Sequence, residues 1–202
     1  MLIDGYFEQV PSVWHKEILW ALSHGRIVAG AASMGALRAA ELDQFGMIGV
    51  GRIYEAYATG TFDPFEDAFE DDDEVAVLHG PAETGYAATE AMVDVRATLA
   101  LAMETRLIAK DVMLAIAASA KGQFYKRRTW ASVLEQADIP EQTRAKLAEW
   151  LPDNRVQQKR LDAIELLRQH AARELVADIP PFRFESTLLW ETELPKILGR
   201  VD

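Results

Sequence analysis

Residues 26–42 constrain the fold of this chain more than any other stretch. An apolar run leads through small residues to Ser33, and an alanine-rich segment that favours a helix follows at once. This succession predicts a strand, a turn and a helix, with the Ser33 hydroxyl at the exposed end of the strand and the positive end of the helix. Backbone N–H groups in the first turn of a helix have no intrahelical partner, so they can bind an anion or an oxyanion. The pattern therefore indicates a site for acyl transfer by a serine.

A simpler interpretation of Ser33 also fits. Serine is among the preferred N-cap residues, and many strand-to-helix turns use it only for capping. The run Gly-Ala-Ala-Ser-Met-Gly also differs from the Gly-x-Ser-x-Gly elbow of the α/β-hydrolases. On these residues alone, capping is the more common role and acyl transfer is the alternative.

The composition limits the chemistry. The chain has 202 residues and 50% hydrophobic content, enough for one domain with a proper core or a small domain with a helical appendage. It contains no cysteine, which excludes disulfides, thiolate metal ligands and catalysis by a thiol. No secretory segment and no apolar run of membrane-spanning length is present, so a cytoplasmic protein that binds no membrane is expected.

The charge is unevenly distributed along the chain. The net charge is −11, and residues 1–80 carry 14 acidic and 4 basic side chains, whereas residues 81–202 carry 18 and 17. Nucleic-acid binding needs clustered Lys and Arg, so the acidic N-terminal half argues against it. The acidic half fits binding to a basic protein surface, or simple solubility.

The first 80 residues have the pattern of alternating strands and helices. The succession β-α-β-α-(α)-β predicts a small parallel sheet with helices on its faces. The strand at 2–3 begins so abruptly that a clipped longer strand or a late start codon is expected. Strands are expected at 2–3, 26–30 and 75–78, helices at 13–24, 34–42 and 52–59, and a mobile loop or tight turn at 45–51.

After residue 81 the pattern changes to helical periodicity. We therefore expect an α/β part at 1–85 that carries the serine site, followed by an all-helical part at 86–202 that is packed on it or appended to it. Helices are expected at 89–106, 111–123, 129–137, 141–150, 154–177 and 186–198.

A catalytic serine needs a base, and the predicted topology supplies candidates. Asp4 follows the first strand, and His15 and Lys16 begin the next helix, so all three are expected at the carboxyl edge of the sheet. That edge also carries Ser33. Lys16 has the stronger case, because a helix N-terminus and partial burial both lower the pKa of a lysine. His15 needs no such adjustment and is a rival, and an isolated lysine in a first turn is most often simply solvated.

Charged residues near Ser33 have two interpretations each. Arg38 and Glu41 are spaced to form an i,i+3 pair of small energetic worth, and Arg38 can instead steer a carboxylate towards Ser33. His24, His79 and His170 are too scattered for a metal site, so none is expected.

The acidic run 70–74 does not have the spacing of a calcium loop. A solvated loop that protects the sheet edge is the favoured interpretation on composition. The alternative is a docking surface for a basic partner, with Asp71, Asp72 and Asp73 as its binding residues.

Several runs together resemble the core of the TfuA family. The resemblance covers about residues 2–106, whereas residues 107–202 carry no motif of use. It rests on Ile-Asp-Gly-Tyr-Phe (3–7), Pro-Ser-Val-Trp-His-Lys-Glu-Ile-Leu (11–19), Gly-Ala-Ala-Ser-Met-Gly-Ala-Leu-Arg-Ala-Ala-Glu-Leu (30–42), Phe-Gly-Met-Ile-Gly-Val-Gly (45–51) and Asp-Asp-Asp-Glu-Val-Ala-Val (71–77).

The resemblance implies a function. TfuA-like proteins accompany YcaO enzymes, ATP-dependent cyclodehydratases that put sulfur into peptide backbones as thioamides. The family resemblance implies a Ser–Lys hydrolase, without a cofactor, that releases sulfide from a thiocarboxylated ThiS-like carrier protein, and also a docking role towards YcaO. Ser33 is the only serine in the matching motif and Lys16 the only lysine in residues 1–109, so the resemblance assigns the pair to them. The N–H groups near Met34 and Gly35 would then hold the oxyanion.

Two other functions compete with the hydrolase. In the first, the protein is a non-catalytic adaptor that docks on YcaO and promotes peptide binding, and Ser33 merely caps a helix. In the second, the glycine-rich turn binds a nucleotide, but no lysine follows it as a P-loop requires.

Overall fold

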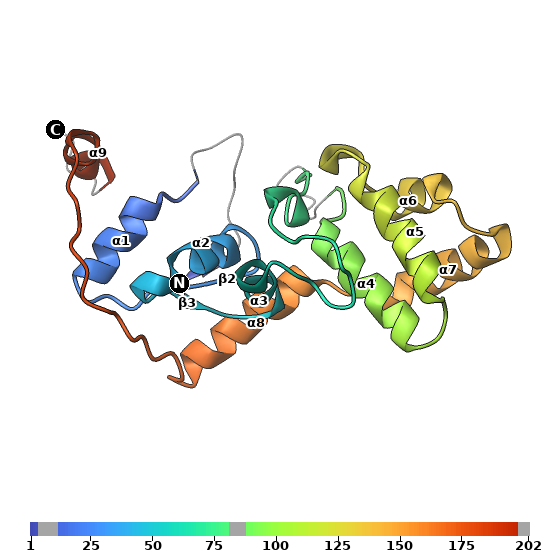
Figure 1. Cartoon of the computed structure of the whole chain (residues 1–202), viewed down its shortest axis with the longest axis horizontal. Helices are drawn as coiled ribbons and strands as arrows, with labels where there is room; N and C mark the ends of the chain where they lie inside the picture. The colour runs from blue at the N-terminus through green and yellow to red at the C-terminus, as the bar shows by residue number, and fades with distance from the viewer. Residues whose placement is uncertain (4–11, 81–87, 198–202) are drawn as a thin grey trace.

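The computed structural model describes residues 1–3, 12–80 and 88–197 (Figure 1). Its N-terminal part is built on three short parallel strands, β1 (Leu2–Ile3), β2 (Ala29–Ala31) and β3 (Ile48–Gly49), in the spatial order β1-β2-β3. Leu2 lies opposite Gly30 in the first pair of strands. The predicted fold class, a small parallel sheet followed by helices, is confirmed.

Helices cover both faces of this sheet. Two of them, α1 (His15–Ser23) and α2 (Met34–Leu42), connect neighbouring parallel strands, and because such crossovers are right-handed, both lie on one face. The other face is covered by α8 (Gln158–Ala171), which returns from far along the chain (Figure 1). Leu166 of α8 is buried in one cluster with Ala31 of β2. The sheet is therefore a middle layer between helices from both ends of the chain.

The larger apolar core lies among the helices that follow the sheet. Ala36 of α2 and Ile53 of the next helix belong to this core, so the helical part packs directly on the α/β part. The helices around it are α3 (Arg52–Thr59), α4 (Met92–Glu104), α5 (Lys110–Lys121), α6 (Trp130–Gln136) and α7 (Glu141–Asn154), with the 3-10 turns η1 (Asp43–Phe45), η2 (Asp72–Glu74) and η3 (Tyr125–Arg127).

The C-terminal segment turns back towards α1. Residues 172–187 contain no helix or strand, and they lead to α9 (Leu188–Ile197), which lies near α1 (Figure 1). The Trp190 ring is buried, 6.3 Å from the Trp20 ring of α1. The helix expected at 154–177 is shorter than predicted, because residue 154 still belongs to α7 and α8 ends at residue 171.

The prediction of the third strand was wrong. Residues 75–78 form no strand, and the third strand is β3, inside the stretch expected to be a loop or turn. Val75 and Ala76 are buried next to η2, and Val75 belongs to the helical core. A short apolar run indicates burial, and periodicity alone does not distinguish a strand from another buried segment.

Candidate active site

Ser33 stands in the turn that joins β2 to α2. It is buried and follows the strand by two residues, so the predicted position at the carboxyl end of a strand is confirmed. The preceding residue, Ala32, has a φ of +76°, a left-handed conformation that costs a residue with a side chain about 1–2 kcal/mol. The Ser33 N–H closes the turn by donating to the Ala31 carbonyl oxygen at 3.1 Å. Strained backbone of this kind is concentrated at functional sites.

The Ser33 hydroxyl does not cap α2. Ser33 occupies the N-cap position, and its carbonyl oxygen accepts hydrogen bonds from the N–H groups of Ala36 and Leu37 at 2.9 and 3.1 Å. Its side chain makes no capping hydrogen bond. The capping interpretation of the hydroxyl was therefore wrong, and the oxygen is left for another role.

The first turn of α2 provides the expected backbone donors. No described residue accepts a hydrogen bond from the backbone N–H of Met34 or Gly35. Gly35 also permits a close approach, because a Cβ atom there would lie 2.1 Å from the Leu2 carbonyl oxygen. A Cβ atom at Gly30 would lie 2.0 Å from the Gly35 carbonyl oxygen. The glycines of the motif therefore hold β1, β2 and α2 in close contact at the turn that carries Ser33.

Lys16 is held by the C-terminal segment. It lies half-buried in the first turn of α1, and its Nζ donates a hydrogen bond to the Glu185 carbonyl oxygen at 2.5 Å. The same Nζ lies 5.3 Å from the centre of the Phe184 ring. Within the described residues, no hydrogen bond joins Lys16 to Ser33, so the Ser–Lys pair stays a prediction.

The remaining support residues form a small cluster of their own. His15 Nε2 lies 2.8 Å from Glu41 Oε2, and Arg38 Nη1 donates to the same oxygen at 2.6 Å. Arg38 Nε also donates to the Val13 carbonyl oxygen at 3.0 Å, which fastens the start of α1 to α2. The pairing interpretation of Arg38 and Glu41 is confirmed. Asp4 lies outside the described residues.

A cavity of about 530 Å³ opens at the carboxyl ends of β1 and β2. Ile3, the last residue of β1, and Ala32, the neighbour of Ser33, are among the residues that line it. Three cationic and two acidic side chains line its walls, so positive charge is in slight excess there, in contrast to the chain as a whole. They are Arg155, Lys159 and Arg160, with Glu90 and Asp94, and the His79 imidazole lines the cavity beside them.

The acidic wall of this cavity is built into the fold. Asp94 of α4 accepts a hydrogen bond from the backbone N–H of Lys159 at 3.2 Å, in the first turn of α8. Burial raises the pKa of Asp94 to about 6, although the hydrogen bond to Lys159 opposes this effect. Glu90 pairs with Arg155 at 2.9 Å, and burial raises its pKa as well. Asp94 thus fixes the start of α8, and with it the basic side chains of that helix.

The α4 and α8 walls of this cavity were not predicted from the sequence. A signal was present in the predicted topology, because parallel sheets are covered on both faces. Since right-handed crossovers place α1 and α2 on one face, a later helix had to cover the other. A helix was expected at 154–177, but nothing local in residues 158–171 indicates that this helix packs on the sheet.

A family model described as TfuA-like protein matches residues 4–129. The chain belongs to the TfuA-like family. The family predicted from the motifs is thereby confirmed. No curated protein matches the chain. The matched range contains every residue predicted for the site, whereas the α8 wall of the cavity lies beyond it.

Over residues 1–3, 12–80 and 88–197, no group of three or more His, Asp or Glu side chains is arranged to hold a metal ion. In the same part of the chain, no helix is both long and apolar enough to cross a membrane.

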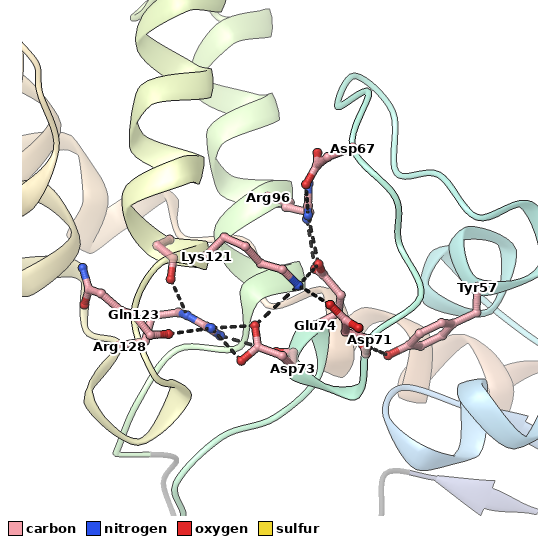
Figure 2. A network of polar contacts seen from close by, with 10 residues as sticks. Tyr57, Asp67, Asp71, Asp73, Glu74, Arg96, Lys121, Gln123 and Arg128 are labelled. Carbon is pink, nitrogen blue, oxygen red and sulfur yellow. Dashed lines mark hydrogen bonds and ion pairs between the residues drawn. The ribbon is translucent and has the colours of Figure 1, made fainter.

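The acidic run of the TfuA-like chain lies within a network of ion pairs (Figure 2). Arg96 of α4 and Glu74 are both fully buried, and Arg96 donates two hydrogen bonds to the Glu74 carboxylate, each of 2.9 Å. Arg128 is also fully buried, and its Nη2 donates to both carboxylate oxygens of Asp73, at 2.8 and 2.7 Å. Lys121 Nζ donates to Glu74 at 2.9 Å.

This network changes the interpretation of the acidic run. The solvated-loop interpretation was wrong for Asp73 and Glu74, whose charges are paired inside the fold. Asp71 and Asp72 are exposed, and Asp71 pairs with Lys121 at 3.3 Å. Partner binding by Asp71, Asp72 and Asp73 stays a prediction.

Proposed function

We propose that this TfuA-like protein is a hydrolase that releases sulfide from a thiocarboxylated ThiS-like carrier protein, for use by a YcaO enzyme in peptide thioamidation. The observation that carries the proposal is the turn at Ser33. There, the strained residue Ala32, which lines the cavity, precedes a serine whose hydroxyl makes no capping bond.

The reaction has two steps that balance in atoms and charge. Ser33 Oγ attacks the thiocarboxylate carbon, the C–S bond breaks, and the serine proton leaves with sulfur as hydrosulfide. Water then attacks the Ser33 ester, restores the hydroxyl and releases the carrier with an ordinary C-terminal carboxylate together with one proton. The N–H groups of Met34 and Gly35, which donate to no described residue, stabilise the oxyanion of each tetrahedral intermediate.

The charge of the cavity supports an anionic substrate. A thiocarboxylate is negatively charged at neutral pH, and the overall charge of −11 would repel it. The basic side chains of the cavity offset this repulsion in the space that Ala32, the residue before Ser33, lines. A thiol-free protein also cannot carry the sulfur itself, so the sulfur must remain on the partner until it is released.

A proton carrier is required in both steps, and we propose Lys16 for this role. Lys16 is half-buried at the start of α1, and a rotation about its side-chain bonds changes the position of Nζ. His15 is the rival, and its imidazole is occupied by Glu41.

A second candidate function is the non-catalytic adaptor that docks on YcaO. The contact that favours it is the hydrogen bond from Lys16 to Glu185, which gives the amine a structural role away from Ser33. An adaptor needs neither a free hydroxyl nor a basic amine. The two functions therefore make opposite predictions for substitutions of Ser33.

The test is sulfide release from a thiocarboxylated carrier, measured by a sulfide-trapping dye. Ser33→Ala and Lys16→Ala are each expected to reduce the rate by about a thousandfold or more, and the double variant to be no slower, because residues that act as a unit are not additive. Lys16→Arg is expected to be equally inactive, since arginine keeps its proton.

The matched control is Ser23→Ala, which changes an exposed serine of α1. It is expected to keep the wild-type rate. Full sulfide release by Ser33→Ala would refute the hydrolase and leave the adaptor. Loss of sulfide release with full YcaO binding by Ser33→Ala would show that catalysis and docking are separate. Activity that survives Lys16→Ala but not His15→Ala would transfer the role of base to His15.

A further inference from the structure

The outer face of α8 carries large apolar side chains. The inner face buries Gln158, Asp162 and Leu166 against the rest of the fold. On the outer face, Ile164 and Leu167 are each 49% exposed, and Leu161 next to them is 53% exposed. A surface helix usually places charged or polar residues on the side that faces water. Three such side chains on one helix therefore indicate a surface that another molecule covers.

This face is continuous with the cavity beside Ser33. Arg160, Ile164 and Leu167 follow one another at i, i+4 and i+7, so they lie along a single line of the helix. Arg160 and Ala163 line the cavity. A molecule that rests on the outer face of α8 therefore also reaches the mouth of the cavity.

The charge at the cavity end of α8 indicates the sign of that molecule. Arg155 and Lys159 have partners within the fold, namely Glu90 and the Val75 carbonyl oxygen. Arg160 is exposed and makes no ion pair or hydrogen bond with any described residue. In a chain with a net charge of −11, an uncompensated arginine beside an apolar stripe favours an acidic partner.

We infer that the outer face of α8 is the docking surface for the carrier protein of the proposed reaction. The carrier lays an apolar patch on Ile164 and Leu167, its acidic rim meets Arg160, and its C-terminal tail enters the cavity towards the turn that carries Ser33. This inference rests on the proposed function. It adds to that function the surface that selects the carrier, which lies outside the matched residues 4–129.

The occupant is a protein with a free chain end rather than a second copy of this chain. The cavity is of a size that binds ligands, and it opens at the end of the apolar stripe. The outer face of α8 can therefore bind the folded part of the carrier while the cavity binds its C-terminal tail.

The test separates docking from chemistry by using the carrier with its ordinary C-terminal carboxylate. Binding is measured by calorimetry for the wild type, Ile164→Glu, Leu167→Glu and Arg160→Glu. Each variant is expected to raise Kd at least tenfold, because a carboxylate is placed against an apolar or acidic surface. The matched control is Leu114→Glu on α5, also an exposed apolar side chain at 40%, and its Kd is expected to stay within twofold of the wild type.

Thermal unfolding verifies that the variants fold, and Leu167→Ser replaces any glutamate variant that does not. A second readout is sulfide release from a short thiocarboxylated peptide, which has a tail but no protein body. Leu167→Glu is expected to keep the wild-type rate on the peptide and to lose at least tenfold in kcat/KM on the carrier.

Three outcomes overturn the docking inference: wild-type affinity in all the α8 variants, no binding of the carrier to the wild type, or a wild-type dimer that Ile164→Glu dissociates in light scattering. If the wild type binds the carrier through α8 but releases no sulfide, the hydrolase is refuted while the docking surface stands.

Discussion

The buried pair of Arg96 and Glu74 makes a strong prediction about stability. Both side chains are fully buried, and Arg96 also donates to the Asp67 carboxylate at 2.8 and 2.6 Å. In Arg96→Met, Asp67 is exposed enough to be hydrated, but Lys121 is then the only described residue that pairs with Glu74. The variant therefore leaves a carboxylate inside the fold with half of its charge compensation removed.

The magnitude follows from the burial of Glu74. Removing one partner of a buried ion pair costs about 3–5 kcal/mol, because the other charge stays desolvated. For a chain of this size, that loss lowers the urea midpoint by about 1–2 M. The double variant Arg96→Met, Glu74→Met has no stranded charge, so most of the lost stability is expected to return.

The assay is urea unfolding followed by circular dichroism. The control is Arg168→Met, which removes an exposed i,i+3 pair with Glu165 and is expected to cost less than about 0.5 kcal/mol. If Arg96→Met costs no more than this control, or if the double variant is less stable than the single one, the reasoning about the buried charge is refuted.

Two further predictions concern the turn and the cavity. Gly35→Ala places a Cβ atom 2.1 Å from the Leu2 carbonyl oxygen, so it is expected to lower Tm far more than the control Gly60→Ala. At Gly60 a Cβ atom meets open space, and the variant loses only about 1–2 kcal/mol of stability because of the φ of +73°. Similar Tm values for the two variants would contradict the close packing at the turn. Burial raises the pKa of Asp94 from 3.8 to about 6, so the folded state binds the Asp94 proton more tightly than the unfolded state does. The stability that the neutral carboxyl contributes is therefore lost as the pH rises from about 4 to about 6. Asp94→Asn does not titrate, so its free energy of unfolding, compared with that of the wild type between pH 4 and pH 7, is expected to lack this loss; an unchanged pH dependence would assign it to other groups.

Local patterns predicted the parts of the fold that local forces determine. The bounds of α2 and α3 match the predicted 34–42 and 52–59, because alanine-rich and periodic segments between glycines specify a helix by themselves. Ser33 was placed correctly at the end of a strand for the same reason. β3 was not found, because its two residues include a glycine and its pairing with β2 comes from a distant part of the chain.

The parts that depend on distant contacts could not be predicted. The partners of Asp73 and Glu74 are Arg128 and Arg96, which lie 55 and 22 residues further along the chain. An acidic run without a nearby base has the pattern of a solvated loop. The cavity likewise needs residues of β1, α4 and α8, so no single stretch of sequence contains it.

The late return of α8 determines when this protein can finish folding. During synthesis, the three strands leave the ribosome more than a hundred residues before Leu166. One face of the nascent sheet is therefore exposed to solvent until α8 has been synthesised and packs on it. A polypeptide restricted to the matched residues 4–129 would keep Ala31 and Val50 uncovered permanently. The exposed apolar face of a parallel sheet promotes association with other chains. We therefore expect the folding intermediate in which residues 158–171 are still unfolded to be the species most prone to aggregate.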